Sequence, residues 1–332
     1  MLFSKDIGID LGTANVLIYK RGEGIVLNEP SVVARNSQTG KVIASGEEAR
    51  QMIGRTPWKI EVIRPMRDGV IADIEATELM LKDFISRAKI KAPLSKPSIL
   101  ICCPSNITEV EKKAIREAAE KTGAKEVIIE EEPKIAALGA GMDISKPSGN
   151  MVIDLGGGTT DIAVLSLGDI VRSRSVKVAG NRFDQDIIDY LKTNYKLLIG
   201  ERTAEDIKFG VATVYLKDRE EETMEVRGRD LVSGLPITIT ITSTEIEEAL
   251  RESVRSILHA TKAVLEETPP ELAADIMDKG IILTGGGALL DGINLLFSEE
   301  LSVPVYPADD PLNCVAHGTG MMLDHIDRVN RR

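Results

Sequence analysis

The sequence is poor in the residues that cross-link a chain or bind transition metals. Its 332 residues include three cysteines and three histidines, and aromatic residues make up only 3%. Cys102 and Cys103 are neighbours in the apolar run ILICCP, which is typical of a buried strand, and Cys314 stands alone. An odd number of cysteines without ligand spacing argues against a disulfide framework or a zinc site. It indicates a reducing compartment such as the cytoplasm.

Several common sequence signals are also missing. No apolar run approaches the roughly 20 residues that span a bilayer, and no basic start with an apolar run marks a secretory signal. There is no G-x-x-x-x-G-K-[ST] motif, and no G-x-G-x-x-G opens a helix after a strand, so P-loop and dinucleotide folds are not expected. The net charge of −11 argues against nucleic acid as a main partner. A composition of 43% hydrophobic and 28% charged residues predicts a packed protein, long enough for two domains.

One glycine-containing hairpin occurs twice in the sequence. The stretches DIGIDLGTANVLIYK (6–20) and MVIDLGGGTTDIAVLS (151–166) each predict two strands joined by a tight turn, with Asp10 or Asp154 just before it. Backbone N–H groups in such turns bind anions, and a carboxylate beside a phosphate requires a cation, usually Mg²⁺, between them. Two ordinary β-hairpins are the alternative, but they explain the matching Asp and Thr positions less well. The repeat therefore predicts two similar domains, each holding phosphate with one hairpin.

A third glycine-rich stretch, GIILTGGGALL (280–290), predicts a strand that runs into three glycines and then a helix. It suits close approach of the backbone to a flat group. The three stretches resemble the phosphate 1, phosphate 2 and adenosine motifs of the actin, sugar-kinase and Hsp70 superfamily. With GIVLNEPSVVA, IRPMRDGVIAD, LIGERTAEDIK, VRGRDLVSGLP and TPPELAADI, the resemblance is most specific for the MreB family of bacterial actins, over nearly the whole chain. LICCPSNITEVEKKAI and Asp161 look closest to the Mbl paralogue.

The resemblance implies an α/β fold, the actin-like ATPase fold, with two duplicated α/β domains that each carry a smaller inserted subdomain. The break SKPSG (145–149) suits a boundary between the domains. The expected ranges are 1–31, 65–146 and 315–332 for domain IA, 32–64 for subdomain IB, 147–180 and 243–314 for domain IIA, and 181–242 for subdomain IIB.

The resemblance also implies ATP and Mg²⁺ between the domains, with Asp10 and Asp154 holding the metal through waters. Glu132 follows a predicted strand and opens a helix, where an acid is also favoured by the helix dipole alone. Its role in positioning the attacking water comes from the resemblance, which also makes Thr159 a catalytic residue. The implied nucleotide contacts are Gly12, Thr13, Ala14, Asn15, Gly156, Gly157, Gly158, Thr160, Ala204, Glu205, Asp206, Ile207, Lys208, Gly285, Gly286, Gly287 and Ala288.

Local patterns predict where particular helices begin and which side chains share a helix face. Thr108 with Glu111, and Thr244 with Glu247, predict capping boxes at the starts of two helices. A helix is expected over 201–215. On that helix the i, i+3 spacing places Glu205 and Lys208 on one face, where a plain ion pair between them is an equally good interpretation.

Family resemblance further implies ATP-dependent filaments of double, antiparallel protofilaments with slow ATP hydrolysis. They would lie in the cytoplasm against the inner face of the membrane, guiding the cell-wall elongation machinery and maintaining rod shape. Leu2, Phe3 and Leu94 are the implied membrane contacts, although Ser95 stands where the family usually has a second apolar residue. The alternatives are a small-molecule kinase, for which no sugar pocket or aspartate base is found, and an Hsp70-like ATPase. Too few residues follow 290 for a peptide-binding domain.

Overall fold

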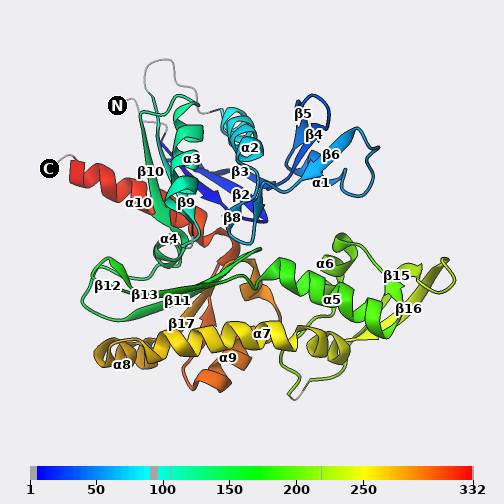
Figure 1. Cartoon of the computed structure of the whole chain (residues 1–332). Helices are drawn as coiled ribbons and strands as arrows, with labels where there is room; N and C mark the ends of the chain where they lie inside the picture. Colours follow the sequence, from blue (N-terminus) through cyan, green and yellow to red (C-terminus); the bar gives the residue numbers. More distant parts are fainter. Residues whose placement is uncertain (1–5, 90–95, 106, 218, 331–332) are drawn as a thin grey trace.

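Two five-stranded sheets form the centres of the two halves of the molecule (Figure 1). The computed structural model describes residues 6–89, 96–105, 107–217 and 219–330. The first sheet has the order β10-β9-β1-β2-β3, with β1 Ile7–Leu11, β2 Asn15–Lys20, β3 Gly24–Pro30, β9 Ser98–Cys103 and β10 Glu126–Glu131. The second has the order β13-β12-β11-β17-β18, with β11 Asn150–Leu155, β12 Thr160–Ser166, β13 Asp169–Val176, β17 Ile281–Thr284 and β18 Val305–Pro307.

The two sheets share one topology. In each, the first strand in sequence (β1 or β11) pairs antiparallel with the next strand (β2 or β12) and parallel with a later one (β9 or β17). Even the register agrees, because Asp10 lies opposite Cys102 of β9 and Asp154 lies opposite Thr284 of β17. The predicted fold class, a duplicated actin-like α/β fold, is therefore confirmed.

Helices α4 (Glu132–Gly139) and α10 (Cys314–Asn330) pack against each other where the two halves meet. A shared apolar cluster joins them to both sheets, with Leu100 of β9 and Val152 of β11 among its buried members. The helices approach closely because Gly318 faces the backbone carbonyl of Ile135, where a Cβ would collide. Burial of this cluster ties the two halves together at one end of their interface.

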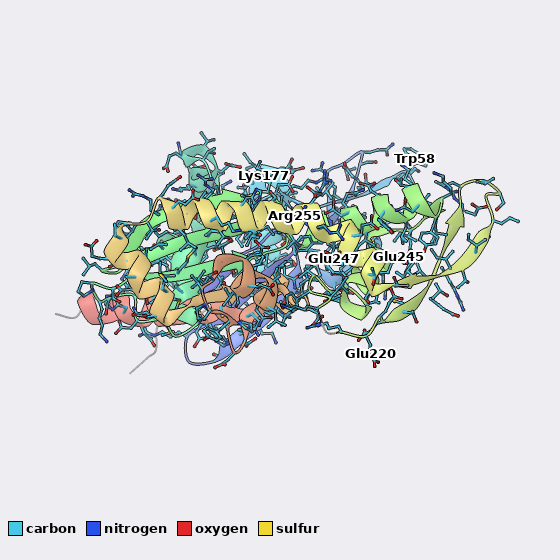
Figure 2. All side chains as sticks on the ribbon, turned by 90° about the horizontal axis from the view of Figure 1, so that it is seen from below. Trp58, Lys177, Glu220, Glu245, Glu247 and Arg255 are labelled. Carbon is cyan, nitrogen blue, oxygen red and sulfur yellow. The ribbon has the colours of Figure 1, made fainter. Side chains whose placement is uncertain are left out.

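The other long helices lie beside the sheets of each half. In the first half these are α2 Ile74–Arg87 and α3 Glu109–Glu120, and in the second half α5 Gly180–Asn194, α6 Glu201–Gly210, α7 Ser243–Glu266, α8 Pro270–Lys279 and α9 Ile293–Leu301. Seen from below, α7 runs along one face of the molecule, with Glu245 and Glu247 near one end and Arg255 further along (Figure 2). None of the helices in the described part of the chain is long and apolar enough to cross a bilayer.

Two small three-stranded sheets lie on the same side of the molecule, one on each half (Figure 1). The first contains β4 Val33–Asn36, β5 Val42–Ser45 and β6 Ile60–Ile63, with helix α1 Glu47–Arg50 beside them. The second contains β14 Leu197–Leu198, β15 Thr223–Asp230 and β16 Pro236–Thr242. The short strands β7 Met66–Arg67 and β8 Val70–Ile71 form a hairpin of their own. The numerical domain boundaries given above stay a prediction.

Of the local predictions, one capping box is confirmed, and the other capping box and the length of one helix are wrong. The capping box of Thr108 with Glu111 is present at the start of α3. The one expected at Thr244 is wrong, because β16 ends at Thr242 and the box that starts α7 is formed by Thr242 with Glu245. The helix expected over 201–215 is also too long: α6 ends at Gly210, since glycine and the β-branched residues that follow disfavour further helix.

Candidate nucleotide site between the two halves

The turns of the two repeated hairpins touch each other across the interface between the halves. A Cβ placed on Gly157 would lie 2.5 Å from Ala14 Cβ, and one on Gly158 would lie 2.7 Å from Thr13 Oγ1. Any side chain at these glycines would force the turns apart. The structure therefore brings together the two stretches that the sequence predicted to hold phosphate, with each half contributing one turn.

Ser31 stabilises the first turn. It is fully buried and was not among the predicted site residues. Ser31 Oγ donates a 2.7 Å hydrogen bond to the carbonyl of Gly12, and Ser31 N donates to the carbonyl of Ala14 at 2.8 Å. On the other side, Gly69 N donates to Thr13 Oγ1 at 3.3 Å. These bonds fix the turn's carbonyls inside the fold and leave its N–H groups available for an anion.

The second turn is tied to the start of α5. Gly180 N donates to the carbonyl of Gly156 at 3.2 Å, and Asn181 N donates to that of Gly157 at 2.8 Å. Thr160 Oγ1 donates to the carbonyl of Val178 at 2.7 Å, so its hydroxyl is engaged with the backbone. Asn15, at the end of the first turn, donates from its side chain to Asn28 Oδ1 at 2.8 Å. The Thr160 hydroxyl and the Asn15 side-chain amide therefore both hydrogen-bond within the protein.

Three predicted acidic residues, Asp10, Glu132 and Asp154, lie close enough to affect one another's ionisation. Burial raises the pKa of Asp10 to about 8, and the Asp154 carboxylate adds to the effect. Burial also raises the pKa of Asp154 to about 6, against the lowering effect of a hydrogen bond from Thr284. The pKa of Glu132 is raised well above its ordinary value, first by burial and then by Asp10, Asp161 and Asp154. The structure thus gathers the predicted metal and catalytic carboxylates at one place.

Two buried carboxylate oxygens of this group have no hydrogen-bond partner among the described residues, Glu132 Oε1 and Asp161 Oδ2. Such atoms are costly unless water or a cation satisfies them. No group of three or more His, Cys, Asp or Glu side chains in the described ranges could bind a metal by itself. Mg²⁺ usually takes one or two carboxylates and completes its shell with phosphate and water oxygens, so the residues present fit it. Asp161, 1% exposed, was not predicted as a site residue.

The adenosine stretch packs on the end of β11. Gly285 has φ +76° and faces the carbonyl of Leu155, and a Cβ on Gly287 would lie 2.7 Å from Leu155 Cβ. The chain then forms a 3₁₀ turn, η1 (Gly286–Leu289), and the expected α-helix begins only at Ile293. These glycines bring the backbone against the strand that carries Asp154, next to the second phosphate turn.

Five of the predicted nucleotide contacts lie on helix α6, and the structure places them in three different environments. Ala204 and Ile207 are buried in the core of the second half, whereas Asp206 is exposed. Lys208 Nζ lies 2.8 Å from Asp184 Oδ1 and donates to the carbonyl of Gly180 at 3.2 Å, which places it beside the second turn. Glu205 Oε2 lies 3.6 Å from Arg50 Nη1 of the first half. Glu205 thus pairs with Arg50 and Lys208 with Asp184, and not with each other.

Three predicted contacts cannot be placed. Leu2, Phe3 and Leu94, the expected membrane contacts, lie outside the described residues. They stay a prediction from the resemblance.

Two duplicated α/β domains that meet through paired glycine turns and share a group of carboxylates define an actin-like protein. The family model described as MreB/Mbl protein matches residues 4–331. The chain belongs to the MreB/Mbl family.

Two curated relatives match this chain over nearly their full length. The chain is 65% identical to the cell shape-determining protein Mbl of Bacillus subtilis over 331 residues, which cover 100% of this chain and 99% of the relative. It is 51% identical to the cell shape-determining protein MreB of Escherichia coli, over 98% of this chain and 95% of the relative. The expected likeness to Mbl is confirmed.

Solved structures agree as well. MreB5 of Spiroplasma citri bound to AMPPNP superposes with a TM-score of 0.92 at 46% identity, covering 98% of this chain and 97% of that one. The same protein bound to ADP gives a TM-score of 0.93 at 46% identity, covering 98% of each chain. The MamK double helical filament gives a TM-score of 0.81 over 96% of this chain and 98% of that one, and at 21% identity it bears on the fold alone.

Proposed function

We propose that the chain is an actin-like cytoskeletal ATPase that forms ATP-dependent filaments on the inner face of the cell membrane. These filaments direct cell-wall elongation and maintain rod shape, through contacts with proteins of the elongation machinery. The observation that carries the ATP site is the contact of Ala14 with Gly157 and of Thr13 with Gly158, which sets two anion-binding turns face to face. The cell-shape role is supported by full-length relatives that carry that name.

In this proposal the phosphates of ATP lie between the turns, and Asp10 and Asp154 hold the Mg²⁺ of the nucleotide through waters. Bound Mg²⁺ would neutralise charge on the phosphoryl oxygens as the terminal phosphate departs. Glu132 accepts a hydrogen bond from the attacking water, because its Oε1 is buried and has no hydrogen-bond partner among the described residues. Thr159 assists from the second turn. Such orientation contributes about 10²–10⁴ in rate.

The adenosine end of the nucleotide would lie along Gly285 to Ala288, with helix α6 on its other side. The backbone there packs closely on β11, which places this stretch beside the second phosphate turn. Lys208 stands beside Gly180, within reach of the second turn, and is placed to meet phosphate charge. A nucleotide that contacts both halves favours the arrangement in which the halves are closed around it. We infer that this closed arrangement favours the polymer and that ATP hydrolysis weakens the polymer.

Self-association is proposed to produce pairs of antiparallel protofilaments, and Leu2, Phe3 and Leu94 to anchor them at the membrane. Burying one such side chain contributes only about 1.5–3 kcal/mol, so stable attachment depends on many subunits binding together. The kinase and Hsp70-like alternatives are not favoured, because the MreB/Mbl family model matches almost the whole chain.

Sedimentation of the pure protein tests this proposal. The protein should pellet with Mg-ATP, show filaments by electron microscopy, and pellet more completely when vesicles containing anionic lipid are added. A protein that binds Mg-ATP yet stays monomeric at all concentrations would argue against the filament. One that phosphorylates a sugar would support the kinase instead.

A further inference from the structure

Asp10 and Asp154 hold equivalent places in the duplicated sheets, but the residues opposite them differ in chemistry. Asp154 lies opposite Thr284 of β17, and Asp10 lies opposite Cys102 of β9. Thr284 Oγ1 donates a 2.6 Å hydrogen bond to Asp154 Oδ1. Among the hydrogen bonds of the described residues, none joins Cys102 to Asp10. The duplicated site is therefore asymmetric at its two carboxylates.

The Thr284 bond constrains Asp154 strongly. Thr284 is fully buried and Asp154 is 5% exposed, so water does not compete for the hydroxyl. Thr284 is β-branched and lies in a strand, which restricts its χ1 angle and so the direction of its hydroxyl. A Cβ on Gly285 would lie 3.0 Å from the same Oδ1 atom. The Thr284 bond thus holds Oδ1, and glycine at position 285 keeps a side chain from crowding that oxygen. Oδ2 is then the oxygen that remains for a cation.

We propose that Thr284 is a positioning residue that fixes Asp154 to receive the Mg²⁺ of bound nucleotide. Because none of the described residues shows Cys102 giving Asp10 such a bond, Asp154 is the more firmly positioned of the two carboxylates. This inference rests on the ATP site proposed above. Thr284 directly precedes the three glycines of the adenosine stretch and was not among the predicted nucleotide contacts.

Mg²⁺ titration separates this role from a merely structural one. The full-length protein is mixed with a fluorescent ATP analogue at fixed concentration, and Mg²⁺ is added while binding is followed. Thr284→Val keeps the shape but removes the hydroxyl, and should raise the Mg²⁺ concentration at half-saturation roughly three- to tenfold. Binding of the analogue in EDTA should stay as in wild type. Thr284→Ser restores the donor and should return the midpoint to within about twofold of wild type.

The matched control is Cys102→Ala, which alters the equivalent position in the other half. It should leave the Mg²⁺ midpoint within about twofold of wild type, since the thiol makes no bond to Asp10. If Thr284→Val unfolds, as judged by its nucleotide-free melting curve, Thr284→Cys replaces it. That variant gives Asp154 the same neighbour as Asp10, and it carries the same expected shift.

An unchanged midpoint in a folded Thr284→Val or Thr284→Cys protein, with wild type responding to Mg²⁺, would overturn the role of Thr284. So would equal weakening of binding in EDTA and in Mg²⁺, since that pattern indicates a general loss of structure. A wild-type protein that binds no ATP analogue at any Mg²⁺ concentration would instead remove the proposed ATP site, and this role with it.

Discussion

Arg64 and Glu201 form an ion pair across the two halves of the molecule, with Arg64 Nη2 2.8 Å from Glu201 Oε2. Arg64 directly follows β6 of the small first-half sheet, and Glu201 begins helix α6. One helical turn further along, Glu205 pairs with Arg50 at 3.6 Å. The same helix face then presents Lys208 to Gly180, beside the second phosphate turn. Helix α6 thus links the contact between the halves to the turn that would hold phosphate.

Charge reversal should show whether this contact retains nucleotide. The Arg64 and Glu201 side chains are 29% and 63% exposed, so the pair contributes less than about 1 kcal/mol. We expect Glu201→Arg to accelerate dissociation of an ATP analogue a few-fold, because like charges then oppose closure. The combination Arg64→Glu with Glu201→Arg should restore the wild-type rate. Stopped-flow fluorescence measures it, and a double variant as fast as the single one would speak against the pair.

Glu132→Gln should separate hydrolysis from binding. The amide keeps the size of the side chain but is a poorer acceptor for the attacking water, so phosphate release should slow about 100-fold. Affinity for ATP should change little, because Glu132 is not proposed to contact nucleotide before the reaction. Phosphate release in single turnover and equilibrium binding of an analogue measure the two quantities. A variant with the wild-type rate would remove Glu132 from the mechanism.

Asp10→Asn should stabilise the nucleotide-free protein. The folded pKa of Asp10, about 8, lies above the ordinary value of 3.8, so the folded state keeps a proton that the unfolded chain loses. The free energy of unfolding therefore falls as pH rises from about 4 to 8. Replacing the acid with the neutral amide should remove the part of this dependence that Asp10 contributes and add about 1 kcal/mol or more at pH 8. Urea unfolding at several pH values measures it, and equal slopes in both proteins would contradict the prediction.

Mg-ATP should stabilise the same variant less than it stabilises wild type. Wild type should melt several degrees higher with Mg-ATP than without it, because a ligand that binds only the folded state stabilises it. Asp10→Asn should show a smaller rise, since one metal-holding carboxylate is gone. If Asp10→Asn melts higher than wild type without Mg-ATP and gains less from adding it, then Asp10 serves binding and destabilises the free protein.

Much of the fold followed from local patterns, and much of the site's detail did not. The repeated Asp and glycine positions around residues 10 and 154 sufficed to predict two domains and opposed turns, because each hairpin is a local structure. The Thr284 bond to Asp154 depends on the register between distant strands, and the Arg64 pair joins residues 137 positions apart. Neither leaves a signal in one sequence. Thr242 and Thr244 both satisfy the capping pattern, and only the end of β16 decides between them.

Exposed apolar residues at the tip of the β15–β16 hairpin offer a test of self-association. Leu231, Val232 and Leu235 are 43%, 84% and 64% exposed, and such clustered apolar surface is typical of protein contacts. Val232→Asp should reduce pelleting with Mg-ATP, because burying an unpaired charge in a subunit contact is costly. Binding of an ATP analogue should stay unchanged, as the hairpin is remote from the turns. Unaltered pelleting would exclude this tip from the filament contact.

Gly158→Ala tests the contact on which the site depends. The added methyl would lie 2.7 Å from Thr13 Oγ1, so the two turns must separate and the phosphates lose one set of N–H donors. Overpacking of this kind costs about 1–3 kcal/mol, and we expect affinity for Mg-ATP to fall at least about tenfold. Gly200→Ala is the matched control, because a Cβ at Gly200 would meet no atom of the described part of the chain within 4 Å. If both variants bind an ATP analogue as wild type does, the facing turns do not hold the nucleotide.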